Sequence, residues 1–298
     1  MRFALVLSVL VACVGDTVDS DVDPGTESSS DPRFDASSWP DTVGTSERPA
    51  GVFAPSNYDG SSKLPVVLLL HGYGATGAVQ DAYFEMSART EPKGFILIVP
   101  DGTVDDSGKR FWNATDACCN FYGSSVDDVD YLLGLLDEVE ETMPVDQDRV
   151  TLLGHSNGGF MSYRMACEAS DRLAGMASLA GSTYLDGAKC DAQGTLSVLQ
   201  IHGVLDSTIA YAGGPYFPSA QQSVQYWATE AACEGPMTGD RADYESAIGG
   251  AETSKKVWSG CEGNVQTELW TIEGGGHIPS FTQAFRDDLL DWLLAQRR

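Results

Sequence analysis

Short apolar runs alternate with amphipathic stretches along most of this chain. The runs lack period-two alternation, which is typical of strands buried on both faces of a sheet. They occupy residues 64–70, 94–100, 149–154, 173–181, 195–203 and 265–272. Between them, apolar residues at helical spacing predict helices over 77–89, 126–143, 156–170, 219–233 and 281–296. Strands separated by helices predict a doubly wound α/β fold, in which helices cover both faces of a mostly parallel sheet.

The first 49 residues do not follow this pattern. Residues 1–13 are an arginine, an apolar run too short to span a bilayer and a cysteine, which predicts a secretory signal. The end of the run is similar to a bacterial lipobox, so we expect Cys13 to be lipidated; an ordinary signal peptide cut nearby is the alternative. Residues 14–49 are rich in Asp, Ser, Thr, Gly and Pro and predict a disordered acidic linker. A single domain, residues 50–298, remains.

The strongly negative net charge argues against anionic binding partners. The formal net charge is -25 and the isoelectric point is about 4.2. Nucleic acids and anionic membrane surfaces would be repelled by such a chain, so neither is expected as a partner. We expect a monomer in the cell envelope or outside the cell, which contacts a membrane only through a lipid anchor.

Cysteine usage fits an oxidising compartment. Without the lipobox cysteine an even set of six remains: Cys118, Cys119, Cys167, Cys190, Cys233 and Cys261. Cys233 and Cys261 flank the insertion between the late helix and the last strand, so we expect them to pair. A disulfide between adjacent cysteines is strained, so Cys118 and Cys119 are expected to pair with the other two, in either of two ways. Zinc-type spacings are missing, and no metal site is expected.

The segment GHSNGG at residues 154–159 lies between a predicted strand and a predicted helix. Gly-x-Ser-x-Gly in this context is typical of a nucleophile elbow, a strained turn that exposes a serine above the ends of the strands. Side chains at Gly154 and Gly158 would collide with neighbouring backbone. Ser156 is therefore the predicted nucleophile.

A serine nucleophile needs a base, and the chain has four histidines. His155 adjoins the serine and should point away from its hydroxyl. His71 is expected to shape the loop that it begins, and His202 to be buried at a strand end. His277, in the glycine-rich segment EGGGH after the last strand, is left as the predicted base.

The orienting carboxylate should lie between the serine and the histidine along the chain. Asp206, on the loop that leaves the strand at 195–203, is favoured over Asp186 and Asp191. For the oxyanion, the backbone N–H of Asn157 and that of Tyr73 are the predicted donors.

Five motifs in order carry a family resemblance: HGYG, DDVDYL, GHSNGG, IHGVLD with YAGG, and EGGGH. Over residues 50–298 the chain resembles the secreted polyhydroxybutyrate depolymerase and feruloyl esterase group of α/β-hydrolases. The resemblance implies the same triad and a cofactor-free ester hydrolase, acting on polyester oligomers or on feruloyl or acetyl esters of plant polysaccharide. Many relatives have Trp-Pro shortly after the histidine, where the tryptophan would line the substrate cleft, whereas this chain has Ile278 and Pro279.

The loop at 101–125 adds a weaker hypothesis. Trp112, Phe121 and Tyr122 alternate with polar residues there, and Trp112 and Tyr122 are candidate substrate contacts; a satellite core is the alternative. Two other functions stay open. One is a serine peptidase on the same fold, and the other is a surface-tethered binding protein without catalysis.

Overall fold

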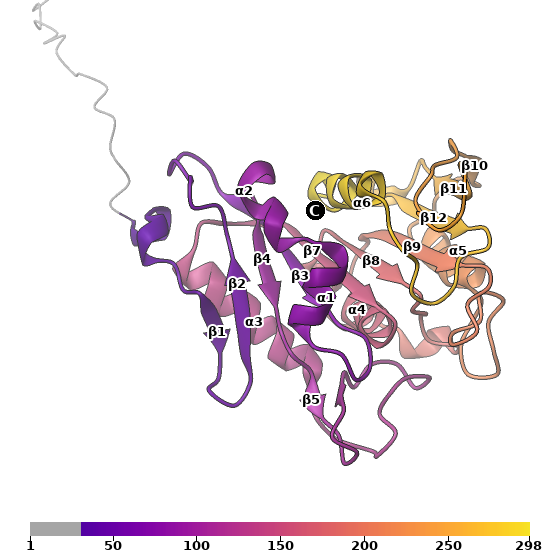
Figure 1. Cartoon of the computed structure of the whole chain (residues 1–298), viewed down its shortest axis with the longest axis horizontal. Helices are drawn as coiled ribbons and strands as arrows, with labels where there is room; N and C mark the ends of the chain where they lie inside the picture. The colour runs from indigo at the N-terminus through magenta and orange to yellow at the C-terminus, as the bar shows by residue number, and fades with distance from the viewer. Residues whose placement is uncertain (1–30) are drawn as a thin grey trace, which may run out of the picture. The chain divides into compact units, whose positions relative to one another are not determined.

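A computed structural model describes residues 31–298 (Figure 1). The predicted signal peptide and Cys13 lie outside the described residues. Within them, ten strands form one mixed sheet in the order β1-β2-β4-β3-β7-β8-β9-β12-β11-β10, with a separate two-stranded ribbon of β5 and β6. The strands are β1 (Thr42–Gly44), β2 (Pro49–Phe53), β3 (Leu64–Leu70), β4 (Ile96–Val99), β5 (Thr103–Val104), β6 (Arg110–Phe111), β7 (Val145–His155), β8 (Gly175–Leu179), β9 (Ser197–Gly203), β10 (Met237–Thr238), β11 (Thr253–Trp258) and β12 (Thr267–Ile272).

The centre of the sheet is parallel and its flanks are antiparallel. The run β4-β3-β7-β8-β9-β12 pairs in parallel throughout, whereas β1, β2, β10 and β11 pair antiparallel with their neighbours. Parallel strands end at the same edge, so the loops that follow β3, β7, β9 and β12 meet at one side of the molecule. The predicted doubly wound, mostly parallel fold is confirmed.

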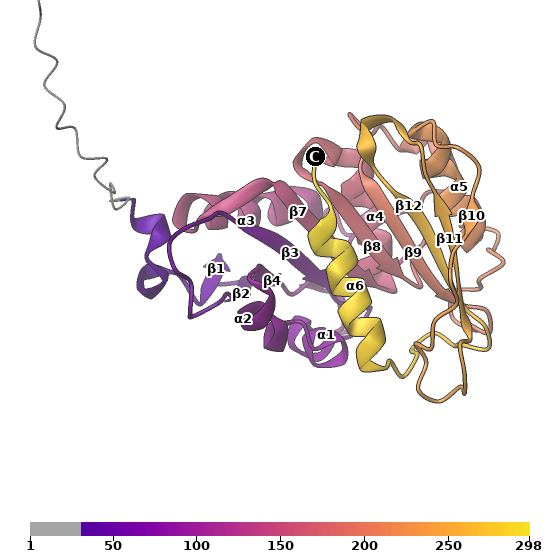
Figure 2. The same cartoon turned by 90° about the horizontal axis from the view of Figure 1, so that it is seen from above.

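Helices cover both faces of the sheet (Figure 2). They are α1 (Gly77–Phe84), α2 (Thr90–Lys93), α3 (Asp128–Thr142), α4 (Asn157–Glu168), α5 (Ala220–Glu230) and α6 (Gln283–Ala295). Alternate residues of β3 separate the two layers, because Val66 packs with α3 and α4 while Val67 packs with α1 and α6. No helix within residues 31–298 is both long enough and apolar enough to cross a bilayer.

The long predicted elements are present, with local differences. The helix predicted over 77–89 is shorter, because Glu85 adopts a left-handed conformation with φ 57° and ends α1. The hydrophobic pattern does not predict four strands, β1, β2, β10 and β11. These strands are short or carry polar side chains; β11, for example, contains two lysines.

The predicted linker over 14–49 is wrong for its second half. Residues 31–49 include two short 3-10 helices and β1, which pairs with β2 at the edge of the sheet. Arg48 also enters the fold, where its guanidinium binds the buried carboxylate of Asp128 at 2.6 Å and lies over the Tyr131 ring. The folded unit therefore includes residues 31–49, because pairing with the rest of the fold orders a segment that composition alone would leave disordered.

The three disulfides differ from expectation in one respect. Cys233 bonds to Cys261, as predicted. Cys167 on α4 bonds to Cys190, with their Cα atoms 4.7 Å apart. That pairing leaves Cys118 and Cys119, which bond to each other. The expectation that these two would pair with Cys167 and Cys190 is wrong, because α4 places Cys167 beside the segment that carries Cys190.

Candidate active site

Ser156 lies in the sharp turn between β7 and α4, at the carboxyl edge of the sheet. Its backbone has φ 54°, the left-handed region that L residues adopt only under strain. The turn requires its two glycines. A Cβ on Gly154 would overlap the carbonyl group of Gly158, and one on Gly158 would overlap the carbonyl group of Leu70. The structure thus has the elbow geometry that the motif predicts, with the serine at the positive end of a helix.

His277 reaches this serine from the loop after β12. Its Nε2 lies 2.9 Å from the Ser156 Oγ, so the hydroxyl donates to the ring. The other ring nitrogen, Nδ1, lies 2.7 Å from the Asp206 Oδ2 and donates to it. The three side chains predicted from the sequence therefore form one hydrogen-bonded line, although they lie 121 and 71 residues apart along the chain.

Asp206 is held on both of its carboxylate oxygens. Its Oδ1 accepts from the backbone N–H groups of Thr208 and Ile209, each at 2.8 Å. Its Oδ2 accepts from His277 and, at 3.3 Å, from the Nε2 of His202. Burial alone would raise the pKa of Asp206, but hydrogen bonds from His202, His277 and the Ile209 N–H outweigh it. The pKa lies below its usual range, so the carboxylate stays ionised.

A buried polar chain lies behind Asp206. The hydroxyl of Tyr163 donates to the Gln200 side-chain oxygen at 2.9 Å, and the Gln200 amide donates to the His202 Nδ1 at 3.1 Å. This leaves the proton on the His202 Nε2, which faces Asp206 and the Ile209 carbonyl oxygen. The sequence shows no pattern that predicts this chain, because its members come from α4 and β9.

The two predicted oxyanion donors flank Ser156. Within residues 31–298, the backbone N–H groups of Tyr73 and Asn157 have no hydrogen-bond acceptor. The Tyr73 loop is fixed by the Gly74 N–H, which donates to the Arg110 carbonyl oxygen at 2.8 Å. Both N–H groups are therefore free to bind a ligand, and they stay the proposed donors.

Trp112 does not line the site. Its side chain is fully buried, and its indole N–H donates to the His71 carbonyl oxygen at 3.0 Å. Its backbone exchanges two hydrogen bonds with the Asn157 side chain. The predicted substrate contact is wrong for Trp112, because the ribbon of β5 and β6 turns the ring into the core. Tyr122 and Phe121 are exposed, and a contact of Tyr122 with substrate stays a prediction.

The other histidines and aspartates weighed in the sequence analysis make contacts of their own. His71 accepts from the Gly102 N–H through Nε2 and shapes the loop after β3, as expected. The His155 Nε2 lies 3.0 Å from the His277 carbonyl oxygen. Asp186 caps a short 3-10 helix, and Asp191 is exposed. Across residues 31–298, no cluster of His, Cys, Asp or Glu could hold a metal ion.

Three contacts from distant segments hold the loop that carries His277. Besides the bond from His155, the Tyr83 hydroxyl donates to the Pro279 carbonyl oxygen at 2.7 Å. The Ser280 N–H donates to the buried Glu245 carboxylate at 2.8 Å. Sequence reasoning missed Tyr83 and Glu245, and no local motif marks them.

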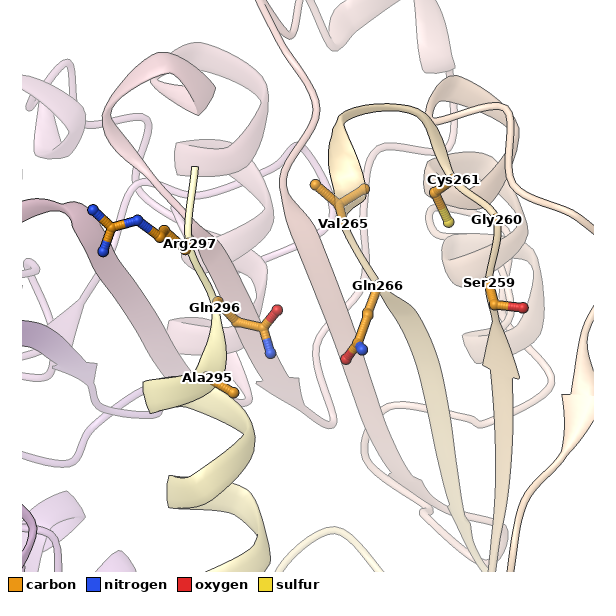
Figure 3. Close-up of a pocket in the computed structure, with 8 residues that line it drawn as sticks. All are labelled: Ser259, Gly260, Cys261, Val265, Gln266, Ala295, Gln296 and Arg297. Atoms are coloured by element: carbon orange, nitrogen blue, oxygen red, sulfur yellow. The ribbon is translucent and has the colours of Figure 1, made fainter.

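A pocket of about 240 Å³ opens beside Ser156 and His277. Its wall is mostly apolar and includes Val79, Tyr83 and Ile278. A second cavity of about 320 Å³ lies between the end of α6 and the start of β12, at the opposite edge of the sheet (Figure 3). Its lining residues are Ser259, Gly260, Cys261, Val265, Gln266, Ala295, Gln296 and Arg297. Only the smaller pocket adjoins the line of serine, histidine and aspartate.

A family model described as "Putative esterase" matches residues 44–244, more than half of the chain. The chain belongs to this esterase family. It is thus a carboxylic ester hydrolase. The matched range contains Ser156 and Asp206 and ends before His277.

Curated relatives and solved structures agree with the family. "Putative esterase NocK" of Nocardia uniformis subsp. tsuyamanensis is 27% identical over 237 residues, which cover 74% of this esterase and 67% of the relative. Feruloyl esterase B of Piromyces equi is 25% identical over 235 residues, covering 75% of this esterase and 41% of the relative. The esterase thus matches less than half of the latter protein. The acetyl xylan esterase from Aspergillus awamori has a TM-score of 0.63 at 16% identity, over 85% of this chain and 97% of that one. The α/β-hydrolase fold and the resemblance to feruloyl esterases are confirmed.

Proposed function

We propose that the protein is a serine esterase in which Ser156 attacks the ester carbonyl carbon. His277 takes the hydroxyl proton through Nε2 and returns it to the oxygen of the leaving alcohol. Asp206 holds the ring in the tautomer that leaves Nε2 unprotonated and stabilises the imidazolium. Water then hydrolyses the acyl-enzyme by the same route. The observation that carries this proposal is the hydrogen-bonded line from Ser156 through His277 to Asp206.

The backbone N–H groups of Tyr73 and Asn157 are the proposed oxyanion donors. They flank the serine and lack acceptors in the described structure, so they can bind the negative oxygen of the tetrahedral intermediate. Preorganised donors of this kind lower the barrier because they need no reorganisation during the reaction.

As substrates we propose feruloyl or acetyl esters of plant polysaccharide. The similarity to feruloyl esterase B, together with the acetyl xylan esterase fold, supports this class over others. Polyester oligomers of the hydroxyalkanoate type stay in the test panel because the sequence motifs resemble both groups.

The test is labelling by a fluorophosphonate probe, followed by hydrolysis of methyl ferulate, acetylated xylan and hydroxybutyrate oligomers. Ser156→Ala should abolish labelling and lower kcat by at least about 10⁴-fold. Folded wild-type protein that takes no label would favour a binding protein, and preference for peptide nitroanilides would favour a peptidase.

We also propose that the esterase works outside the cytoplasm on a lipid anchor at Cys13. The three disulfides of the folded unit support an oxidising compartment. Incorporation of radiolabelled palmitate that is lost in Cys13→Ser would support the anchor. Secretion of a free, unlabelled wild-type protein would end this part of the proposal.

A further inference from the structure

Two polar side chains in the wall of the pocket beside Ser156 have one atom bound to the protein and one atom that finds no partner within residues 31–298. They are Gln80 on α1 and His155 at the end of β7, which are 3% and 7% exposed. Most of the remaining wall is apolar. Buried polar groups are normally paired, so two incompletely paired side chains in one pocket indicate a ligand.

In each side chain, the atom that is bound to the protein determines whether the unbound atom is a donor or an acceptor. The Gln80 Oε1 accepts from the Gly72 N–H at 3.2 Å, so its amide nitrogen, a donor, is left over. The His155 Nε2 lies 3.0 Å from a carbonyl oxygen, that of His277, and must therefore carry the proton. Its Nδ1 is then an acceptor. In residues 31–298 neither leftover atom has a protein partner, and neither is sealed from solvent.

Both leftover atoms belong to side chains that border Gly72. Gln80 binds its N–H, and a Cβ built on Gly72 would lie 3.7 Å from the His155 Nδ1 and 3.4 Å from the Ser156 Cβ. The donor and the acceptor are thus parts of one small region next to the serine. Burial lowers the pKa of His155 to about 4, so the ring is neutral near neutral pH and Nδ1 keeps its lone pair.

A group that both accepts and donates satisfies this pair, and the simplest is a hydroxyl. A carbonyl or ether oxygen would use only Gln80. A carboxylate has no fit, because no Lys or Arg lines the pocket. We propose that Gln80 and His155 form a subsite for a hydroxyl of the ester substrate, which accepts from the Gln80 amide and donates to the His155 Nδ1.

This subsite rests on the proposed esterase function and sharpens it, since it selects hydroxylated esters over their deoxy analogues. The hydroxyl can be phenolic or aliphatic on the acyl group, or it can belong to the alcohol. Three pairs of esters that differ by one hydroxyl separate these sources: methyl para-hydroxycinnamate and methyl cinnamate, nitrophenyl beta-hydroxybutyrate and nitrophenyl butyrate, and hydroxyethyl butyrate and ethyl butyrate.

The measured quantity is the ratio of kcat/KM within each pair. In the wild type, at least one pair should favour the hydroxylated ester by about tenfold or more, since a site built to pair a hydroxyl discriminates strongly against its absence. Two variants keep the protein's own hydrogen bonds and change the leftover atoms: Gln80→Glu replaces the donor nitrogen with an acceptor oxygen, and His155→Gln removes the acceptor Nδ1. Gln80→Glu keeps an oxygen for the Gly72 N–H, and His155→Gln keeps an N–H for the His277 carbonyl oxygen.

Each variant should bring the ratio in the favoured pair close to one. A general loss of activity cancels in the ratio, because both esters meet the same enzyme. Gln221→Glu, an exposed position on α5, is the matched control for the added charge and should keep the wild-type ratio. Ratios near one for all three pairs in the wild type, or a preference that survives both variants, would overturn the subsite. Absence of hydrolysis of all six esters together with absence of fluorophosphonate labelling would instead overturn the esterase mechanism, and the subsite with it.

Discussion

The two edges of the parallel sheet differ in the state of their polar groups. At the amino edge, two polar side chains that line the larger cavity are bound to the protein: the Gln296 amide donates to the Trp292 carbonyl oxygen, and Arg297 pairs with Asp146 and Asp148. At the carboxyl edge, a smaller pocket holds a strained serine, a histidine aligned with it and two backbone N–H groups that have no acceptor in the described part of the chain. The volume of a cavity is therefore a poor guide to function in this protein, and the alignment of a serine with a histidine and a carboxylate is a better one.

Among the variants that test this contrast, a change at Asp206 should have the largest effect on kcat. Asp206→Asn should lower kcat about 10³- to 10⁴-fold, because an amide can hold His277 in the wrong tautomer. Steady-state hydrolysis of nitrophenyl acetate measures this, with Asp191→Asn at an exposed position as the matched control. A loss below about tenfold would mean that the carboxylate at this edge only supports the structure.

The hydrogen-bonded side chains behind Asp206 should have a smaller effect on kcat. Gln200→Leu removes the donor that fixes the His202 tautomer, and we expect kcat to fall about tenfold with a smaller change in KM. Tyr163→Phe removes only the far end of the chain and should cost less than about threefold. Equal effects of the two variants on kcat would contradict transmission through His202.

Acid should lower the free energy of unfolding, because it protonates the buried His155. Its pKa is lowered by burial from an ordinary value of 6.5 to about 4, so the unfolded chain binds the proton more readily than the folded one. The stability that neutral His155 contributes is present above pH 6.5 and is lost as the pH falls to 4, up to about 3 kcal/mol.

Urea unfolding of the wild type and of His155→Gln at pH 7 and pH 4 measures this contribution. The wild type should lose more stability on acidification than the variant, because glutamine does not titrate. Parallel losses in the two proteins would show that His155 is not the group responsible.

The smallest effect should come from the amino edge. Gln266→Ala and Arg297→Ala alter the wall of the larger cavity in Figure 3, and kcat/KM should stay within about twofold of the wild type. A tenfold loss with either variant, in protein with an unchanged thermal midpoint, would break the contrast between the two edges.

The sequence predicts the parts of the site that local motifs specify. Ser156 is marked by its glycines, Asp206 and His277 by loops that leave strands, and the parallel sheet explains why such loops meet. Contacts between distant segments leave no local pattern. The Tyr83 hydroxyl binds a carbonyl group 196 residues away, and Glu245 binds Ser280 across 35 residues.

Predictions from composition and residue type alone are less reliable, because they too depend on contacts between distant segments. An aromatic side chain such as Trp112 suits a core or a cleft equally well, and only the turn of the β5–β6 ribbon decides which. The edge strand β1 is stable through its pairing with β2, although its own composition favours disorder.

The short edge strands of the ten-stranded sheet affect the tendency of the protein to aggregate. β1 is three residues long and β10 only two, and each is separated from the parallel strands by one antiparallel strand. Long open edges invite other chains to add strands, and short ones offer few unpaired backbone groups to begin such growth. The fold thus carries a broad sheet with little exposure to edge-to-edge aggregation, and its most reactive loops belong to interior strands that cannot be extended by a neighbour.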